Sequence, residues 1–322
     1  MYLGYRTLLV STFLTLSVSA GPSFGWGDEG HKIVATVAAS VLKTEGSPTL
    51  QKLSAILAAD GTHLTDDTGI ASEATWADKY RESSEAAAEL TADWHFVNTD
   101  YDHPNAAQAC KHPAFNGSAS EGPSPDCVID KVVQFIAELK SAQTSSQEQL
   151  RALQYVLHFV GDIHQPLHAI ARTDPAIGHD DRGGNCVGIL RGNAHTPIKL
   201  HGYWDTGLVV EALGKDPATA ATKVMALLTP ANKEKWSGGT PSDWANESYG
   251  IGKSKVYAGV IDQAPAETGY VFPPFEGRPD KCGPSNVYKL DPGYDGPAKA
   301  VVEEQLAKAG LRLAQVLKDS IR

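Results

Sequence analysis

The sequence predicts a mainly α protein, a single helical domain of the kind that carries long loops and little β structure. Apolar residues recur with the helical period in four segments, near residues 31–41, 128–139, 153–160 and 298–322. Segments of alternating polarity are scarce. Three long stretches rich in Gly, Pro and Asp separate the helices, at about 101–126, 172–198 and 264–298. Loops of that length are uncommon in compact domains unless they are functional.

Each predicted helix has an apolar face of its own. The first follows His31 and carries Ile33, Val34, Val37, Ala38 and Val41. The second carries Val128, Val132, Phe135, Ile136 and Leu139, and the third carries Leu153, Val156, Leu157 and Val160. The last segment is amphipathic and ends in basic residues. It is therefore expected to form a C-terminal helix that packs on the surface of the domain.

The first 25 residues have the pattern of a secretory signal peptide. Arg6 precedes an apolar run from Leu8 to about Val18, which is too short to span a bilayer. Ser23 and Gly25 favour cleavage after Gly25, and cleavage after Ala20 is the alternative. Residues 1–25 are thus expected to be the signal and 26–322 the functional domain. The mature protein is expected to be secreted or periplasmic, monomeric and not associated with a membrane.

Charge and cysteine content narrow the class of protein. The chain has 38 acidic and 28 basic residues, a formal net charge of −10. This balance argues against a broad basic groove for nucleic acid unless bound cations supply positive charge locally. The four cysteines, Cys110, Cys127, Cys186 and Cys282, fit an oxidising compartment and allow three pairings. We favour Cys110–Cys127, which brackets a loop-like stretch, and this choice leaves Cys186 with Cys282.

Residues that bind metals are densest in LHFVGDIHQPLH, residues 157–168. His158 and Asp162 are four apart and share one face of a helix, so both can reach one metal ion. Pro166 interrupts the helix and lets the chain turn His168 inward. His164 lies off that face and is expected to be structural or to support the ligands. Taken alone, a His/Asp pair at this spacing also fits an ordinary hydrogen bond on a helix surface.

Further histidines and aspartates extend the pattern. His201 and Asp205 repeat the spacing of four, Asp78 follows Trp76, and His95 follows Trp94. Each alone has an ordinary alternative, such as a helix cap or a buried core histidine. Together with His31 they give eight nitrogen and oxygen donors without a thiolate, a set that suits two or three zinc ions. Clusters of several metal ions favour phosphoryl chemistry.

Six sequence motifs, taken together and in order, resemble those of a known family. WGDEGH, TWAD, WHFV, HFVGDIHQPLH, GGN and HGYWDTGL occur in the order found in the zinc-dependent single-strand-specific nucleases, the nuclease S-one and P-one family. That family shares a mainly helical fold with bacterial zinc phospholipase C. The resemblance runs from Trp26 to about Leu208, and only the general helical character continues beyond it.

The resemblance implies a secreted zinc-dependent endonuclease that hydrolyses phosphodiester bonds of single-stranded DNA and RNA. Its products would be 5′-phosphorylated, and 3′-nucleotides would also be substrates. A cluster of three Zn²⁺ would activate water. The implied ligands are Asp78, His95, His158 and Asp162 for the first zinc, Trp26, His31 and the shared Asp162 for the second, and His168, His201 and Asp205 for the third. Trp26 would bind through its free α-amine and its carbonyl, so cleavage after Gly25 would activate the enzyme.

The resemblance also implies residues that contact substrate. Asp78 and Asp162 would be catalytic through the metals, and Arg81 would stabilise charge on the phosphate unless it is simply a helix-surface arginine. Phe96 would stack on a base, although packing beside His95 is its alternative. Asn98 stands where some members have an aspartate that contacts the base, so base preference stays open. Asn185 ends the Gly-Gly-Asn stretch, which would close on substrate or be only a turn.

Two other functions compete with this interpretation. A zinc phospholipase C would share the N-terminal tryptophan and the three metals. Its last carboxylate ligand is a glutamate, however, where this chain has Asp205. The surrounding WAD, GGN and WDTG sequences also follow the nuclease pattern. A secreted zinc-binding protein without catalysis is the second alternative, and Arg81 and Phe96 argue against it.

Overall fold

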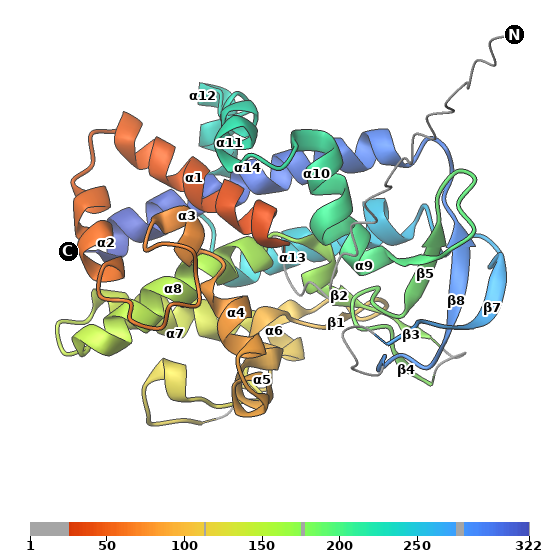
Figure 1. Cartoon of the computed structure of the whole chain (residues 1–322), viewed down its shortest axis with the longest axis horizontal. Coiled ribbons are helices and arrows are strands. Elements are labelled where there is room, and N and C mark those ends of the chain that lie inside the picture. The colour runs from red at the N-terminus through yellow and green to blue at the C-terminus, as the bar shows by residue number, and fades with distance from the viewer. Residues whose placement is uncertain (1–25, 113, 175–177, 275–279, 322) are drawn as a thin grey trace, which may run out of the picture.

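The computed structural model describes residues 26–112, 114–174, 178–274 and 280–321, so the expected signal segment 1–25 lies outside the described residues. The protein is mainly helical, as predicted, with a small sheet at one end (Figure 1). The α-helices are α1 (Asp28–Thr44), α2 (Thr49–Leu57), α3 (Ile70–Glu73), α4 (Trp76–Glu82), α5 (Glu85–Thr91), α6 (Ala106–Ala109), α7 (Val128–Lys140), α8 (Ser146–Asp162), α9 (Leu200–Gly202), α10 (Leu208–Leu213), α11 (Pro217–Met225), α12 (Pro230–Trp236), α13 (Pro241–Ile251) and α14 (Asp295–Ser320).

Short helical turns connect several of these elements. They are η1 (Ala92–His95), η2 (Ala119–Glu121), η3 (Pro166–His168), η4 (Tyr203–Gly207) and η5 (Gly252–Tyr257). Local sequence fixes where helices begin. Ser145 caps α8 by accepting a hydrogen bond from the backbone N–H of Glu148, and Thr240 forms a capping box with Asp243 at the start of α13.

The predicted apolar faces form the core. All the residues named for α1 and α8 are buried, as are those of α7 except Ile136, which is partly buried. In Figure 1, α1 lies alongside α14 and α7 alongside α8. The first three predicted helices are therefore confirmed both as helices and in the face that they bury.

The prediction for the last helix was wrong in one respect. α14 is not confined to the surface: it contacts α1, α7, α8, α10, α11 and α12, and residues 305–314 are all buried, Gln305, Lys308 and Arg312 among them. It approaches α1 very closely, because a Cβ atom at Gly310 would lie 2.4 Å from Cγ1 of Val37. A glycine at this position lets the two helix backbones come together.

Two of the three predicted loops contain strands. β5 (Val187–Leu190) and β6 (Ile198–Lys199) come from the second stretch, and β7 (Glu267–Val271) and β8 (Pro284–Lys289) from the third. They form one sheet in the order β6-β5-β8-β7, in which β5 and β8 run parallel. The two other sheets described are short pairs, β1 (Thr99–Asp100) with β2 (Ile170–Ala171) and β3 (Thr173–Asp174) with β4 (His179–Asp180).

Both favoured disulfides are present. Cys110 is bonded to Cys127, and Cys186 to Cys282. The second bond joins the chain just before β5 to the chain just before β8, so it fixes the two strands that run parallel. Disulfides of this kind suit an extracellular protein. Among the described residues, no helix is both long enough and apolar enough to cross a membrane.

Candidate metal centre

The eight predicted histidines and aspartates come from separate parts of the chain and meet in the interior. His31 lies on α1, Asp78 on α4, His95 on η1, and both His158 and Asp162 on α8. The helix α8 ends at Asp162, and Pro166 starts the turn η3 that carries His168, as the proline predicted. The last two, His201 and Asp205, lie on α9 and η4. All eight side chains are buried.

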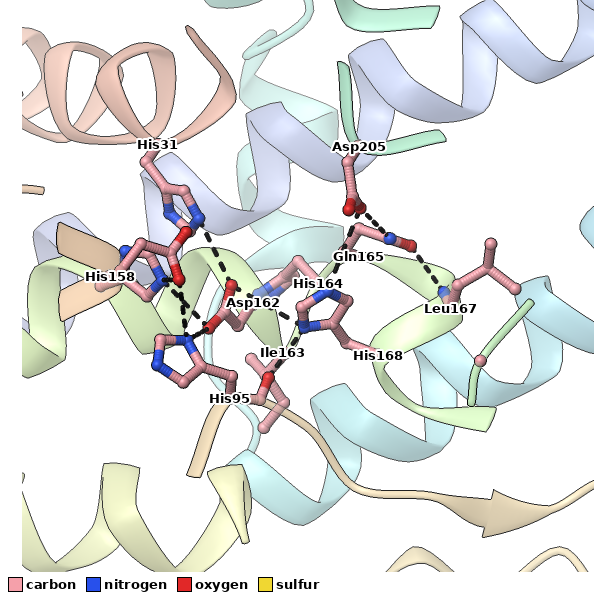
Figure 2. A network of polar contacts seen from close by, with 12 residues as sticks. His31, His95, His158, Asp162, Ile163, His164, Gln165, Leu167, His168 and Asp205 are labelled. Atoms are coloured by element: carbon pink, nitrogen blue, oxygen red, sulfur yellow. Dashed lines mark hydrogen bonds and ion pairs between the residues drawn. The ribbon is translucent and has the colours of Figure 1, made fainter. Parts of the chain in front are cut away.

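Asp162 lies at the centre of this cluster (Figure 2). Its Oδ2 atom is 3.0 Å from Nδ1 of His95 and 3.3 Å from Nε2 of His158. Its Oδ1 atom is 3.4 Å from Nε2 of His31 and 3.8 Å from Nδ1 of His168. One carboxylate therefore faces different histidines with its two oxygens, an arrangement in which it can serve two cations at once.

Three groups of ligand atoms in the cluster lie close enough to hold a metal ion, and the atoms of each group lie within 4.8 Å of one another. They are His31, Asp78 and His158; His95, His158 and Asp162; and His168, His201 and Asp205. The last group has the membership expected for the third zinc. The first two groups divide the remaining residues differently from the expectation, because the rings of His31 and His158 stack with centroids 3.7 Å apart. The assignment of each residue to a particular ion stays a prediction.

Many ligand atoms of the cluster are buried without a hydrogen-bond partner. They are Nε2 of His31, His95, His158, His168 and His201, together with Oδ1 of Asp78, Oδ1 of Asp162 and Oδ2 of Asp205. Buried polar atoms are normally hydrogen-bonded, since leaving one without a partner costs about 1–3 kcal/mol. Bound cations would satisfy these atoms. Imidazole nitrogens and carboxylate oxygens without a thiolate form a donor set that zinc accepts.

Backbone carbonyls orient three of the histidines. Nδ1 of His158 donates to the carbonyl of Ala74 at 2.8 Å, and Nδ1 of His168 donates to that of His95 at the same distance. Nδ1 of His201 donates to the carbonyl of Gly183 at 2.7 Å. Each bond holds the proton on Nδ1 and leaves Nε2 free as a ligand, the usual arrangement around metal sites. Sequence reasoning missed these partners because a carbonyl can come from any residue.

A glutamine supports the last carboxylate. Nε2 of Gln165 donates to Oδ1 of Asp205, and Oε1 of Gln165 accepts from the backbone N–H of Leu167 (Figure 2). Local spacing in the sequence did not predict this role for Gln165. Its position between the two predicted ligands Asp162 and His168 was a signal that could have shown this role.

Burial and charge keep most of the histidines neutral. Burial lowers the pKa of His168 to about 3, and burial together with the nearby Arg81 lowers that of His95 to about 4. Burial also acts to lower the pKa of His158. The carboxylates of Asp162 and Asp78 outweigh it and raise that pKa to about 9. A neutral imidazole is the form that binds a metal, and the excess of carboxylate around His158 attracts cations.

His164 is separate from the cluster, as predicted. Its Nδ1 donates to the carbonyl of Val160 at 2.7 Å, and its Nε2 accepts from Nη1 of Arg312 on α14 at 2.8 Å. Burial and the Arg312 charge lower its pKa to about 3. A further set of possible ligands, Cys110, Cys127 and Asp130, has its two sulfurs joined in a disulfide, so it supplies no thiolate.

The other predicted residues surround the cluster. Trp26 is fully buried, and the backbone N–H of Gly27 donates to the carbonyl of Asp205 at 3.0 Å, so the start of the described chain lies beside the third group. Arg81 is buried, with Nη2 3.0 Å from Oδ1 of Asp78. The Arg81 guanidinium therefore contacts one of the predicted ligands directly.

The residues predicted to contact substrate differ in how deeply they are buried. Phe96 and Asn98 are half-buried, and Phe96 lies outside the main hydrophobic core of the described residues. The backbone N–H of Val97, between them, donates to the carbonyl of His168 at 2.8 Å. Asn185 is buried, and its Nδ2 donates to the carbonyl of Arg182 at 3.0 Å, where it closes a turn. No contact that is described brings these side chains into the ligand cluster itself.

A mainly helical domain around buried histidines and aspartates defines a class of protein that can hold metal ions in its interior. The chain matches the S1/P1 nuclease family over residues 26–322, and it belongs to that family. It is 31% identical to nuclease S1 of Aspergillus oryzae over 293 residues, which cover 91% of this chain and 90% of that protein.

Further relatives agree. The chain is 29% identical to nuclease P1 of Penicillium citrinum over 189 residues, 59% of this chain and 60% of that protein. It is 25% identical to endonuclease 2 of Arabidopsis thaliana over 321 residues, 98% of this chain and 97% of that protein. The homologues S1 and P1 are phosphodiester hydrolases, which places this chain among the enzymes of that class.

Proposed function

We propose that this protein is a secreted zinc-dependent endonuclease. Its substrates would be single-stranded DNA and RNA, which it would cleave to 5′-phosphorylated products, and 3′-nucleotides, from which it would remove the phosphate. The single observation that carries this proposal is the set of eight buried ligand atoms without hydrogen-bond partners, in a chain of the S1/P1 nuclease family. Bound cations would satisfy those atoms, and they would offset the negative net charge where a polyanionic substrate must bind.

The residues would divide into three sets of ligands. We propose that Asp78, His95, His158 and Asp162 hold one zinc, that Trp26, His31 and Asp162 hold a second, and that His168, His201 and Asp205 hold a third. Zinc bound in such a cluster lowers the pKa of water and stabilises charge on the attacking and leaving oxygens of a phosphodiester. The protein supplies fixed ligands for it, since carbonyls and Gln165 hold the histidines and Asp205 in place.

Residues beside the ligands would bind the substrate. The guanidinium of Arg81 is held by Asp78 and would interact with the phosphate as negative charge develops there. The half-exposed ring of Phe96 would stack on a base, and this interaction accepts any base. Asn98 and Asn185 would add hydrogen bonds. In the present arrangement Asn185 keeps Oδ1 available, since only its Nδ2 bonds to Arg182.

The experiment that tests the proposal pairs metal content with product analysis. Secreted, N-terminally sequenced protein is analysed for zinc per chain and for release of 5′-mononucleotides from single-stranded DNA and RNA, with and without chelator. Near three zincs, a Trp26 start and chelator-sensitive release would support it. Zinc-loaded protein that releases no nucleotide would contradict it, and hydrolysis of phosphatidylcholine would then be tested. Fewer than two zincs would contradict the ligand assignment.

A further inference from the structure

A buried aspartate outside the ligand cluster organises the loop that holds His201. Asp181 is fully buried, and its Oδ1 accepts hydrogen bonds from the backbone N–H groups of Arg172 at 3.1 Å and Gly184 at 3.2 Å. The hydroxyl of Tyr257 lies 3.0 Å from Oδ1 and 2.8 Å from Oδ2. Tyr257 is also fully buried, on η5. A carboxylate with this many donors is fixed in place.

The loop that Asp181 fixes has little conformational freedom. Gly183 and Gly184 have φ values of +59° and +80°, a backbone region that residues other than glycine rarely adopt. A Cβ atom at Gly183 would lie 2.2 Å from the carbonyl oxygen of Leu167. The loop is therefore pressed against the segment that precedes His168. The side chain of Asn185 closes this turn through the carbonyl of Arg182, and the bond from Gly184 N–H to Asp181 adds a restraint on the second of two glycines that would otherwise allow many conformations.

The same loop is hydrogen-bonded to the predicted ligand His201. The carbonyl of Gly183 accepts the Nδ1 proton of His201, and the backbone N–H of His201 donates to the carbonyl of Gly184 at 3.3 Å. Nε2 of His201 then lies 3.1 Å from Oδ2 of Asp205. We propose that Asp181, braced by Tyr257, is a positioning residue that sets the geometry of the His168, His201 and Asp205 group through the Gly183–Gly184 turn. This inference rests on the proposed function, in which that group holds the third zinc.

The histidines of the two other groups are not oriented by this loop. Nδ1 of His158 donates to the carbonyl of Ala74, and Nδ1 of His95 lies 3.0 Å from Oδ2 of Asp162. Removing Asp181 should therefore weaken one zinc and spare the other two. Loss of a group that supports a ligand typically lowers metal affinity 10–100-fold. A purely structural role would lower thermal stability without this selectivity.

The test is a zinc titration in competition with a chromophoric chelator, made on the full mature chain. Asp181→Ala is expected to weaken one of three zincs by about 10–100-fold. Asp181→Asn should keep most of the affinity for this zinc, because the amide oxygen can still accept hydrogen bonds from the backbone N–H groups of Arg172 and Gly184. Tyr257→Phe keeps the ring and should weaken the same zinc by a smaller factor, which gives a readout even if Asp181→Ala does not fold.

Two further variants make the test selective. Asp126→Asn exchanges an equally buried carboxylate, which accepts from Gln134 and has no described hydrogen bond to this loop, and should lower the melting temperature while all zinc affinities stay unchanged. Asp205→Asn removes a ligand of the same group, so adding Asp181→Ala to it should cost no further zinc. The inference is overturned if Asp181→Ala binds zinc like the wild type, weakens all sites equally, or acts additively with Asp205→Asn. Wild-type protein that binds no zinc would instead contradict the proposed function.

Discussion

Gly161 lies directly against the ring of His31: a Cβ atom at residue 161 would come within 2.9 Å of Nδ1 of His31. Gly161 precedes Asp162 in the last turn of α8, so the two helices that bring His31 and Asp162 together can approach only because no side chain lies between them. A distance of 2.9 Å is closer than a Cβ atom tolerates, and this buried ring has little space to move.

Gly161→Ala should therefore lower zinc binding and nuclease activity. Alanine alone would favour the helix by up to about 1 kcal/mol, so any loss comes from displacement of His31. Zinc per chain and activity are measured together. Gly250→Ala, on α13 with nothing within 4 Å of its added Cβ, is the control and should leave both unchanged. Wild-type zinc content in Gly161→Ala would show that His31 is not a ligand.

Asp162→Asn should cost more zinc than Asp205→Asn. The two oxygens of Asp162 face different histidines, whereas Asp205 faces the third group through Oδ2 and is bound to Gln165 through Oδ1. If Asp162 is shared as proposed, loss of its charge would affect two cations. Zinc per chain after exhaustive dialysis measures the difference, and equal losses in the two variants would argue against a shared ligand.

Arg81→Ala should lower kcat on the order of a hundredfold, the usual loss when one charged donor to a transition state is removed, with zinc content unchanged. Lys79→Ala, on the same helix, breaks only the ion pair with Asp28 and is the control with unchanged kcat. Steady-state kinetics and zinc analysis are made on the same preparation. A fall in bound zinc in Arg81→Ala would assign Arg81 a structural role through Asp78.

One additional residue before Trp26 should reduce activity in a protein that remains folded. A free α-amine has an ordinary pKa near 8 and releases its proton to a metal, whereas a peptide nitrogen is a far poorer ligand. Gly27 anchors this segment to Asp205 and is expected to keep it in place. Zinc content and circular dichroism accompany the assay. Full activity of the extended chain would mean that the amine does not bind zinc.

Glu138→Gln should change how stability depends on pH. Burial and the neighbouring carboxyl of Glu148 raise the pKa of Glu138 from 4.5 to about 7. Between pH 4.5 and about 7, the folded protein therefore keeps a proton on Glu138 that the unfolded chain has lost. The contribution of protonated Glu138 to the free energy of unfolding is complete below pH 4.5 and is lost as pH rises to about 7.

Glutamine mimics the protonated form at every pH. The melting temperature of Glu138→Gln minus that of the wild type should therefore grow as pH rises from about 4.5 to about 7 and level off above it. Thermal unfolding in buffers across this range measures the difference. A difference that does not vary with pH would show that Glu138 titrates normally in the folded protein.

The helices and the candidate ligands could be predicted from the sequence because both follow local spacing. His158 and Asp162 share a helix face at any position in a fold, and the apolar face of α1 is visible in five residues. The central position of α14 could not be predicted in this way, because Gln305, Lys308 and Arg312 interrupt its apolar face. They are buried only because they find partners far away in sequence, such as His164 and Glu247.

The sheet and the supports of the ligands were also beyond local reasoning. β5 pairs with β8, about a hundred residues later, and both strands are short and contain residues typical of turns, Gly188, Pro284 and Asn286 among them. The role of Asp181 depends on a hydroxyl from Tyr257 and on a glycine carbonyl. These partners meet through tertiary packing, which no local spacing records.

The contact between α1 and α14 pairs the first and the last helices of the described chain. While the protein is being made, α1 lacks its contact with α14 until nearly the whole sequence has emerged, and closing so long a loop is slow. A chain shortened at its C-terminus would lack α14, which packs against the helix that carries His31. Premature termination should therefore yield inactive protein rather than a smaller nuclease.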